Sequence, residues 1–273
     1  MKKLLAMILA LVMVFALCAC GAAPAKEEAN TLILGTSADY APFEFMYPND
    51  KGEMVYGGID VFVAEYLAEA TGKELKIENM AFDYLLAALQ KGDYDIVIAA
   101  MEETEERLNA ADFSDPYYTD YPAMILVKAD KAEEYATLAD FDGLSVAAQT
   151  GTTKLDIVNN DMTGANAVPL QNVNDMVNQL INDKIDAAVL DGGVALEFAE
   201  ADDSLAIAVA SDELGAAAPF CVAVQKGDPK GLLPGINEAI AKMIEEGKIE
   251  EFSAKADELS GIAVEVSAEA PEA

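Results

Sequence analysis

Short apolar runs alternate with amphipathic stretches from residue 31 onward. Between the apolar runs, apolar residues recur every three or four positions over 59–70 and again up to Gly92. A short apolar run between turn residues predicts a buried strand, and a period near 3.6 predicts a helix. This βαβαβ order predicts an α/β fold with a parallel sheet and helices on its faces. In this part of the chain the predicted strands are 31–35, 75–77 and 95–99.

A second α/β unit begins near Leu144. Its clearest helix covers 173–181, with apolar residues at helical spacing. A further apolar run at 220–224 precedes a closing amphipathic helix around Ile240. The residues 261–273 are acidic and small, which predicts a disordered tail. The strands predicted in this unit are 144–148, 165–170 and 187–190.

Polar or small residues follow four of the apolar runs. Because ligands bind at the carboxyl edges of parallel strands, these residues predict a cleft. Thr36, Ser37 and Tyr40 follow the run 31–35, and Ala100, Glu102 and Arg107 follow the run 95–99. Residues 149–153 follow the run 144–148, and residues 191–193 follow the run that ends at Leu190.

Arg107 is the only arginine in the chain, and every other cationic side chain is a lysine. The guanidinium is a planar fork of donors that can hold a carboxylate through two parallel hydrogen bonds, which lysine cannot do. Its place just beyond a predicted buried strand indicates that Arg107 binds the carboxylate of a small ligand. The alternative is a surface salt bridge with Glu103, Glu106 or Asp112.

The sequence Gly151-Thr-Thr153 opens a predicted helix, whose free N–H groups and dipole favour an anion. Asp191 is a single carboxylate at the end of its strand and is suited to an ammonium group. Together with Arg107, these residues predict a site for a zwitterion. Each has an ordinary alternative, because Gly-Thr-Thr can be a plain N-cap and Asp191 can cap the helix after it.

Composition excludes several other functions. The chain has 273 residues, a net charge of −32 and no histidine. Such a charge argues against nucleic acid or anionic lipid as a partner of the folded body. The lack of histidine argues against a zinc site or a histidine-based triad. A metal site built from carboxylates alone is the alternative to scattered surface acids, and we expect no cofactor. Cys221 lies alone in an apolar run and is expected to be a small buried hydrophobe.

The first residues have the pattern of an export signal. Lys2 and Lys3 precede an apolar run that ends at Leu17 and is too short for a comfortable membrane span. The sequence Leu17-Cys18-Ala-Cys20-Gly resembles a bacterial lipobox. That resemblance predicts a signal peptide at 1–19, lipidation of Cys20 and a flexible tether at 20–30. The protein would then be anchored by lipid to the outer face of the cell membrane, with ordinary secretion as the alternative.

Several short motifs occur in an order that resembles one known family, the extracytoplasmic amino-acid-binding proteins of ABC importers, called solute-binding family 3. The resemblance covers nearly all of 32–252. The motifs are Tyr40-Ala-Pro-Phe43-Glu-Phe, Gly58-Ile-Asp60, 87–95 (AALQKGDYD), Thr104-Glu-Glu-Arg107, 112–117 (DFSDPY), Gly151-Thr-Thr153 and Lys226-Gly-Asp-Pro229.

The resemblance implies two α/β lobes joined by two crossover strands, the type II periplasmic-binding-protein-like fold. Lobe 1 would comprise 31–122 and 221–260, and lobe 2 would comprise 123–220. The ligand would lie between the lobes.

The resemblance also implies a role for each matching residue. Arg107 would hold the α-carboxylate, with the hydroxyl or N–H of Thr153 and the N–H of Glu102. Asp191 and the carbonyl of Ala100 would accept the α-ammonium group.

Three aromatic residues, Tyr40, Phe43 and Phe82, would form the walls of the side-chain pocket, although Phe43 could instead be core. Thr152 and Ser37 complete the candidate site.

Two positions depart from the family pattern. Glu102 stands where Ser or Thr is usual, and a carboxylate there is unfavourable beside a ligand carboxylate unless it turns away, pairs with Arg107 or meets a cation. Ser37 stands where members that bind basic amino acids tend to be acidic. Ser37 therefore favours a neutral polar or apolar ligand, which Glu102 could reverse.

The expected function is a monomeric binder that closes around an amino acid and delivers it to an ABC permease. The membrane would be contacted only through the lipid anchor. Two alternatives belong to other classes. One is a dehydratase-like enzyme with Glu102 as general acid or base. The other is a sensory module that delivers its ligand to a receptor.

Overall fold

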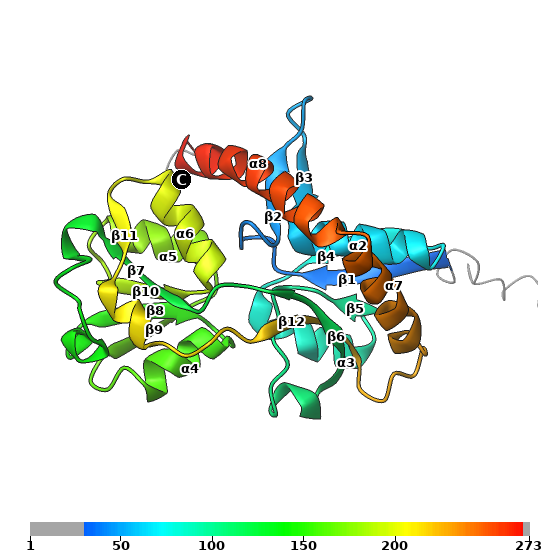
Figure 1. The fold of residues 1–273 in the computed structure, drawn as a ribbon, viewed down its shortest axis with the longest axis horizontal. Helices are drawn as coiled ribbons and strands as arrows, with labels where there is room; N and C mark the ends of the chain where they lie inside the picture. Colours follow the sequence, from blue (N-terminus) through cyan, green and yellow to red (C-terminus); the bar gives the residue numbers. More distant parts are fainter. Residues whose placement is uncertain (1–29, 270–273) are drawn as a thin grey trace, which may run out of the picture.

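The computed structural model describes residues 30–269. The predicted signal peptide, Cys20 and nearly all of the tether lie outside these residues. Two lobes stand side by side, each built around its own sheet (Figure 1). Within 30–269 no helix is both long and apolar enough to span a membrane.

The sheet of lobe 1 has the order β4-β1-β5-β12-β6. The first three strands are parallel, as the βαβαβ order predicted, and β12 runs antiparallel to both β5 and β6. These strands are β1 (Thr31–Thr36), β4 (Glu74–Asn79), β5 (Ile96–Val97), β6 (Ala111–Thr119) and β12 (Pro219–Gln225).

Helices α2 (Ile59–Ala70), α3 (Leu85–Lys91) and α7 (Leu233–Glu245) complete lobe 1, with a hairpin of β2 (Phe45–Pro48) and β3 (Met54–Gly57). Gly58 precedes α2 with a φ of 114°, and a Cβ atom there would lie 2.1 Å from the Phe43 carbonyl oxygen. Only glycine fits this close approach of two backbones.

Lobe 2 contains the sheet β11-β7-β10-β8-β9, in which β10, β8 and β9 are parallel. Its strands are β7 (Met124–Lys128), β8 (Ser145–Gln149), β9 (Asn166–Leu170), β10 (Ala187–Leu190) and β11 (Leu205–Ile207). Its helices are α4 (Thr153–Asn160), α5 (Val173–Ile181) and α6 (Gly192–Ala201).

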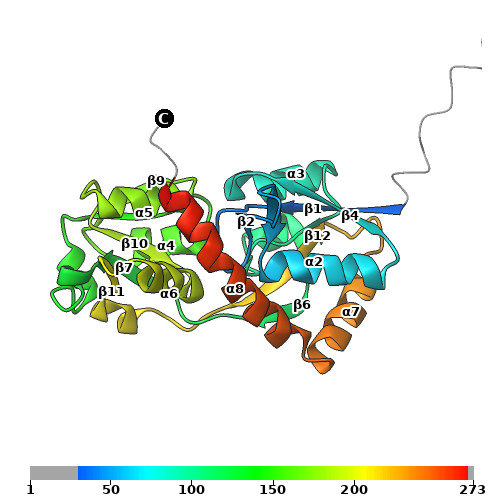
Figure 2. The same cartoon turned by 90° about the horizontal axis from the view of Figure 1, so that it is seen from above.

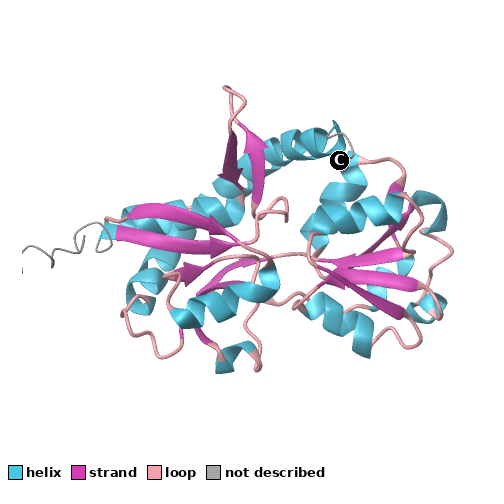
Figure 3. Ribbon diagram, turned by 180° about the vertical axis from the view of Figure 1, so that it is seen from behind, coloured by secondary structure: helices cyan, strands magenta, loops and turns pink. Residues whose placement is uncertain are grey.

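The chain passes between the sheets twice, at 120–123 and at 214–218. These two short connections between the lobes are visible from behind in Figure 3. The carboxyl ends of β1 and β5 in lobe 1 face those of β8 and β10 in lobe 2, as the contacts described below require.

Helix α8 (Lys248–Glu269) crosses from lobe 1 to lobe 2, as Figure 2 shows from above. It packs on α2 through Phe252, whose ring centroid is 5.9 Å from that of Phe62. The hydroxyl of Ser260 donates a hydrogen bond of 2.5 Å to Glu197 on α6. The helix also covers 261–269, where the sequence predicted disorder. These residues continue a helix that is already formed on the body, and adding a residue to an existing helix is far easier than starting one.

Candidate functional site

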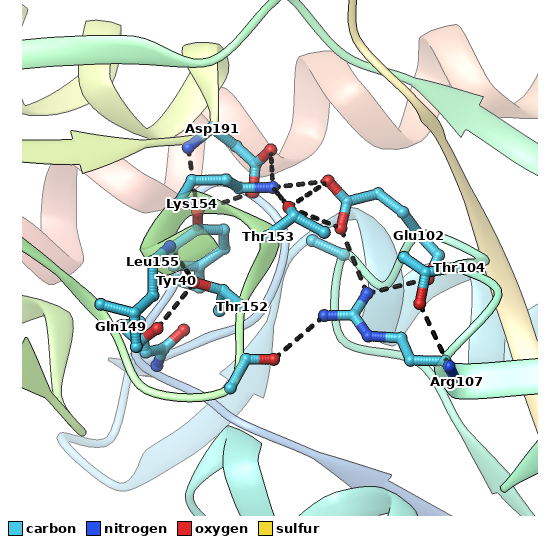
Figure 4. A network of polar contacts seen from close by, with 12 residues as sticks. Tyr40, Glu102, Thr104, Arg107, Gln149, Thr152, Thr153, Lys154, Leu155 and Asp191 are labelled. Atoms are coloured by element: carbon cyan, nitrogen blue, oxygen red, sulfur yellow. Dashed lines mark hydrogen bonds and ion pairs between the residues drawn. The ribbon is translucent and has the colours of Figure 1, made fainter. Parts of the chain in front are cut away.

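The four strand ends from which the sequence predicted a cleft meet between the lobes. Tyr40 and Arg107 come from lobe 1, and Thr153 and Asp191 come from lobe 2. Hydrogen bonds cross the gap at several points, and the network is drawn in Figure 4. The guanidinium of Arg107 is therefore at the interface of the lobes, with 9% of the residue exposed. The salt-bridge alternative required the guanidinium to lie on the open surface, and it does not lie there.

Arg107 contacts both lobes. Its Nη1 donates to the main-chain oxygen of Glu102 at 2.8 Å and to Glu102 Oε2 at 3.2 Å. Its Nη2 donates to the carbonyl of Gly151 in lobe 2 at 3.2 Å. The guanidinium lies over the ring of Phe82 at 5.3 Å, which holds its plane by a cation–π contact. Arg107 is thus held in place to bind a carboxylate, and the carboxylate it holds here is that of Glu102.

The residues at the start of α4, in lobe 2, contact the carboxylate of Glu102. Gly151 has a φ of 80°, and a Cβ there would lie 3.2 Å from Asp83 Cβ in lobe 1. Thr153 Oγ1 donates to Glu102 Oε1 at 3.0 Å. Thr152, predicted as a ligand contact, is the N-cap of α4, because its hydroxyl accepts from Leu155 N–H and donates to the Gln149 carbonyl. Thr152 is therefore an N-cap, and it also lines the cleft beside Thr153.

Lys154, which the sequence analysis did not single out, is at the centre of the network. Its Nζ lies 2.6 Å from Glu102 Oε1 and 2.5 Å from Asp191 Oδ1, and only 4% of the residue is exposed. A lysine in the first turn of a helix opposes the helix dipole. That unfavourable position was a signal in the sequence, and the two carboxylates explain how it is tolerated.

Asp191 lies on the lobe 2 side and is also bonded to lobe 1. The hydroxyl of Tyr40 donates to Asp191 Oδ2 at 2.7 Å and accepts from the main-chain N–H of Asp191 at 3.0 Å. Asp191 precedes α6 but makes no side-chain cap there. Its carboxylate is therefore directed into the cleft, where the cation it holds is Lys154.

The charges of this cluster compensate one another. Burial alone would lower the pKa of Lys154, but the carboxylates of Asp191 and Glu102 reverse this, so its pKa is raised. Burial raises the pKa of Glu102, while Lys154 and Arg107 more than offset it and leave that pKa lowered. Burial raises the pKa of Asp191, which Lys154 opposes. Two cations and two carboxylates thus give a formal charge near zero.

Ala100 has an unusual backbone conformation for a residue other than glycine, with a φ of 44°. Its N–H donates to the buried Asp60 at 2.6 Å, and the hydroxyl of Tyr117 donates to the other oxygen at 2.7 Å. Asp60 thereby bends the chain after β5, which is why this strand ends at Val97 and not at the predicted residue 99. The bend places Ala100 in the lining of the cleft.

Two predicted contacts lie elsewhere. Phe43 is 0% exposed, and its ring packs edge-on against Phe220 and Tyr118, with centroids 5.2 and 5.5 Å away. It is a core residue of lobe 1 and does not form a pocket wall. Ser37 donates to Asp39 at 3.2 Å, and Asp39 accepts from the N–H of Val173 in lobe 2. Ser37 therefore positions Asp39 beside the cleft.

Glu44 is a second residue that the sequence analysis did not single out. It is 1% exposed and lines the cleft together with Tyr40, Asp191 and Lys154. Its Oε2 has no hydrogen-bond partner among the described residues. Burial, followed by the charge of Asp60, raises the pKa of Glu44 well above its usual value.

The cleft has a closed inner part and an open outer part. The inner cavity, lined by Tyr40, Glu44 and Lys154, measures about 10 Å³, because the side chains of the network fill it. The outer groove has a volume of about 600 Å³ and is lined by Phe82, Arg107 and the start of α4. Among residues 30–261, no group of three or more acidic or cysteine side chains is placed to hold a metal ion.

Two α/β lobes with a polar cleft between them define a two-lobed solute-binding protein. The model of the bacterial extracellular solute-binding proteins, family 3, matches residues 32–256. The chain belongs to this family and has its periplasmic-binding-protein-like fold, as the motifs predicted.

Known proteins support this assignment. The arginine-binding extracellular protein ArtP of Bacillus subtilis is 31% identical over 93% of this chain and 98% of its own length. The L-cystine-binding protein TcyJ of Escherichia coli is 30% identical over 84% of this chain and 83% of its own. Among solved structures, an amino acid ABC transporter substrate-binding protein of Streptococcus pneumoniae bound to L-arginine has a TM-score of 0.79 at 34% identity. That match covers 85% of this chain and 95% of the other.

Proposed function

We propose that this protein binds an amino acid between its lobes and delivers it to an ABC permease. One observation carries the proposal: the groups that hold a carboxylate and an ammonium in the cleft come from opposite lobes. Arg107 contacts a carboxylate from lobe 1 and Thr153 contacts it from lobe 2, while Asp191 of lobe 2 and Tyr40 of lobe 1 meet beside an ammonium. A zwitterion bound to both sets would hold the lobes together.

The cleft supports a cationic amino acid as the ligand. Glu44 is buried beside the cavity with one free oxygen, and an unpaired buried acid is costly unless a ligand pairs with it. A guanidinium or ammonium on the ligand side chain would pair with this oxygen. Ser37 favoured a neutral ligand in the sequence, but Ser37 is bonded to Asp39, so its identity does not decide the charge of the pocket.

The relatives are consistent with this choice, because ArtP is an arginine-binding protein and the Streptococcus structure holds L-arginine. The ligand class of the family varies, since TcyJ binds L-cystine. L-arginine is therefore the first candidate for this chain.

Binding would proceed by hinge closure about the two connections at 120–123 and 214–218. The permease would recognise the closed form. We propose a binder without turnover, because the buried carboxylate of Glu102 is paired with Lys154 and Arg107 and has a lowered pKa. Such a carboxylate is a poor general acid. A monomer attached to the membrane by lipid at Cys20 remains part of the proposal.

Calorimetry with a panel of ligands tests the proposal. The protein is unfolded and refolded first, to strip any solute carried through purification. We expect L-arginine to bind, and we expect agmatine, which lacks the carboxylate, to bind at least about tenfold more weakly, a loss of ~1.4 kcal/mol. Glu44→Gln should weaken L-arginine more than L-glutamine. Equal affinity for L-arginine and agmatine would contradict the carboxylate site, and binding of neutral amino acids alone would contradict the cationic ligand.

A further inference from the structure

Glu102 and Lys154 join the two lobes through one ion pair. Glu102 lies in lobe 1 and Lys154 in lobe 2, 2.6 Å apart, and both side chains are at least nine-tenths buried. Lys154 continues the chain of contacts to Asp191, and Glu102 continues it to Arg107. The ion pair is therefore built from the same groups that are proposed to bind the ligand.

The pair reproduces the polar ends of a zwitterion. The carboxylate of Glu102 lies against Arg107 and Thr153, where a ligand carboxylate would bind. The ammonium of Lys154 lies against Asp191, where a ligand ammonium would bind. We infer that Glu102 and Lys154 act as a built-in substitute ligand, which holds the lobes closed and competes with the solute. This inference rests on the proposed function of the site.

The space in the cleft requires such competition. The inner cavity measures about 10 Å³, which is about the volume that one water molecule needs. An amino acid that reaches both Asp191 and Arg107 cannot enter while the side chains of Lys154 and Glu102 occupy the gap. Entry therefore needs the lobes to part and both side chains to swing away.

The competition also selects the ligand. Removal of Lys154 from between Glu102 and Asp191 leaves the buried carboxylate of Asp191 without a cation and Glu102 with Arg107 alone, which is costly. A ligand that brings its own cation can replace Lys154, whereas an uncharged solute or a simple carboxylate cannot. The apparent affinity is lowered by the fraction of molecules in which the substitute is in place. Lys154 and Glu102 thus determine both specificity and affinity.

Two variants test the inference. Lys154→Met keeps the apolar stem and removes the charge. Glu102→Thr combined with Lys154→Met removes both charges at once and leaves their partners, Asp191 and Arg107, open to the ammonium and carboxylate groups of a ligand. Lys128→Met is the matched control, because Lys128 pairs with Asp183 on lobe 2, on its exposed surface.

The first measurement is the affinity for L-arginine by calorimetry. We expect the double variant to bind at least about tenfold more tightly than the parent, and Lys128→Met to bind like the parent. A double variant that binds L-arginine more weakly would show that Lys154 or Glu102 contacts the ligand directly, and would overturn the inference.

The second measurement is small-angle scattering of the refolded proteins without added solute. We expect the double variant to have the larger radius of gyration and to become compact when L-arginine is added. Equal radii for the parent and the double variant would overturn the inference. The comparison of radii without added solute does not depend on a ligand. If no amino acid binds to any of the proteins, the proposed function fails, while a difference in radius still supports the closure by Glu102 and Lys154.

Discussion

Arg107 makes contacts that use the full width of its guanidinium. Nη1 and Nη2 reach different lobes, and the flat face lies on Phe82. A lysine would supply a single ammonium group in place of the two guanidinium nitrogens that reach different lobes. We expect Arg107→Ala to weaken amino acid binding by roughly 30-fold to several thousand-fold, since truncating one partner of a buried charge pair costs ~2–5 kcal/mol. Arg107→Lys should also be severe, as measured by calorimetry.

A matched control for Arg107 is Lys76→Ala, which removes a cation from an exposed ion pair with Glu78 on lobe 1. This control should bind like the parent, because exposed pairs contribute little. Near-parental affinity in Arg107→Lys would remove the guanidinium from the binding step, even if the side chain lies in the cleft.

The sequence could predict residues whose type is unusual for their place. Arg107 was found because it is the only arginine, and Asp191 because it ends an apolar strand. Lys154 was not predicted as a site residue, because the chain has many lysines. Only its position at the N-terminus of a helix distinguishes this one. Phe43 was predicted to line the pocket because its motif resembles that of the family, but its ring packs against two other aromatic rings in the core. Such packing depends on β12, far away in the sequence.

At the scale of elements, hydrophobic periodicity predicted the buried parts well. Helices α2 and α5 have the predicted bounds, and strands β1, β8 and β10 lie within one residue of theirs. The pattern failed for β6, whose sequence ADFSDPYYT contains Pro116 and two aspartates. This strand forms at the edge of the sheet, where proline and charges are tolerated. Its pairing with β12 is a long-range contact that no local pattern reveals.

Helix α8 ties the lobes together outside the two connections. The hydrogen bond from Ser260 to Glu197 joins α8 to α6, and Ser260 is 0% exposed. We expect Ser260→Ala to lower the free energy of unfolding by ~1 kcal/mol, because one hydrogen bond is lost. Urea unfolding measures this, with Glu258→Ala, an exposed position on the same helix, as the control.

The contact of α8 with Glu197 also resists opening of the lobes, because α8 begins on lobe 1 and Glu197 belongs to lobe 2. Ser260→Ala should therefore raise the radius of gyration slightly in scattering. A variant that matches the parent in stability and in radius would show that the α8 contact does not join the lobes in solution.

For the whole molecule, the fold explains why an acidic chain can place carboxylates inside. The net charge is −32, and most acidic residues are exposed, but Asp60, Glu44, Glu102 and Asp191 are buried between or beside the lobes. Hydrogen-bond donors from the backbone and from tyrosine satisfy Asp60, and cations satisfy Glu102 and Asp191. The remaining cost of burying ionised carboxylates appears as raised pKa values of several of these acids.

This cost predicts the pH dependence of stability. Burial raises the pKa of Asp39, Asp60 and Asp120 from 3.8 to about 6 in each case. Between these two values the folded chain binds more protons than the unfolded chain, so the free energy of unfolding falls as the pH rises from about 4 to about 6. One pKa unit corresponds to ~1.4 kcal/mol, so the raised pKa of Asp60 alone accounts for a fall of a few kcal/mol in the free energy of unfolding. The lowered pKa of Glu102 acts in the opposite direction, and only at more acidic pH.

We therefore expect a higher midpoint of thermal unfolding at pH 5 than at pH 7.5. The chain has no histidine, so no imidazole titrates within this window. Repulsion among the surface acids would give the same trend, but salt screens exposed charges far more than buried ones. Repeating the measurement at roughly 0.5 M salt, several times the physiological ionic strength, separates the two causes. A trend that persists in salt comes from the buried aspartates, whereas a midpoint that is flat or rises with pH would contradict their raised pKa values.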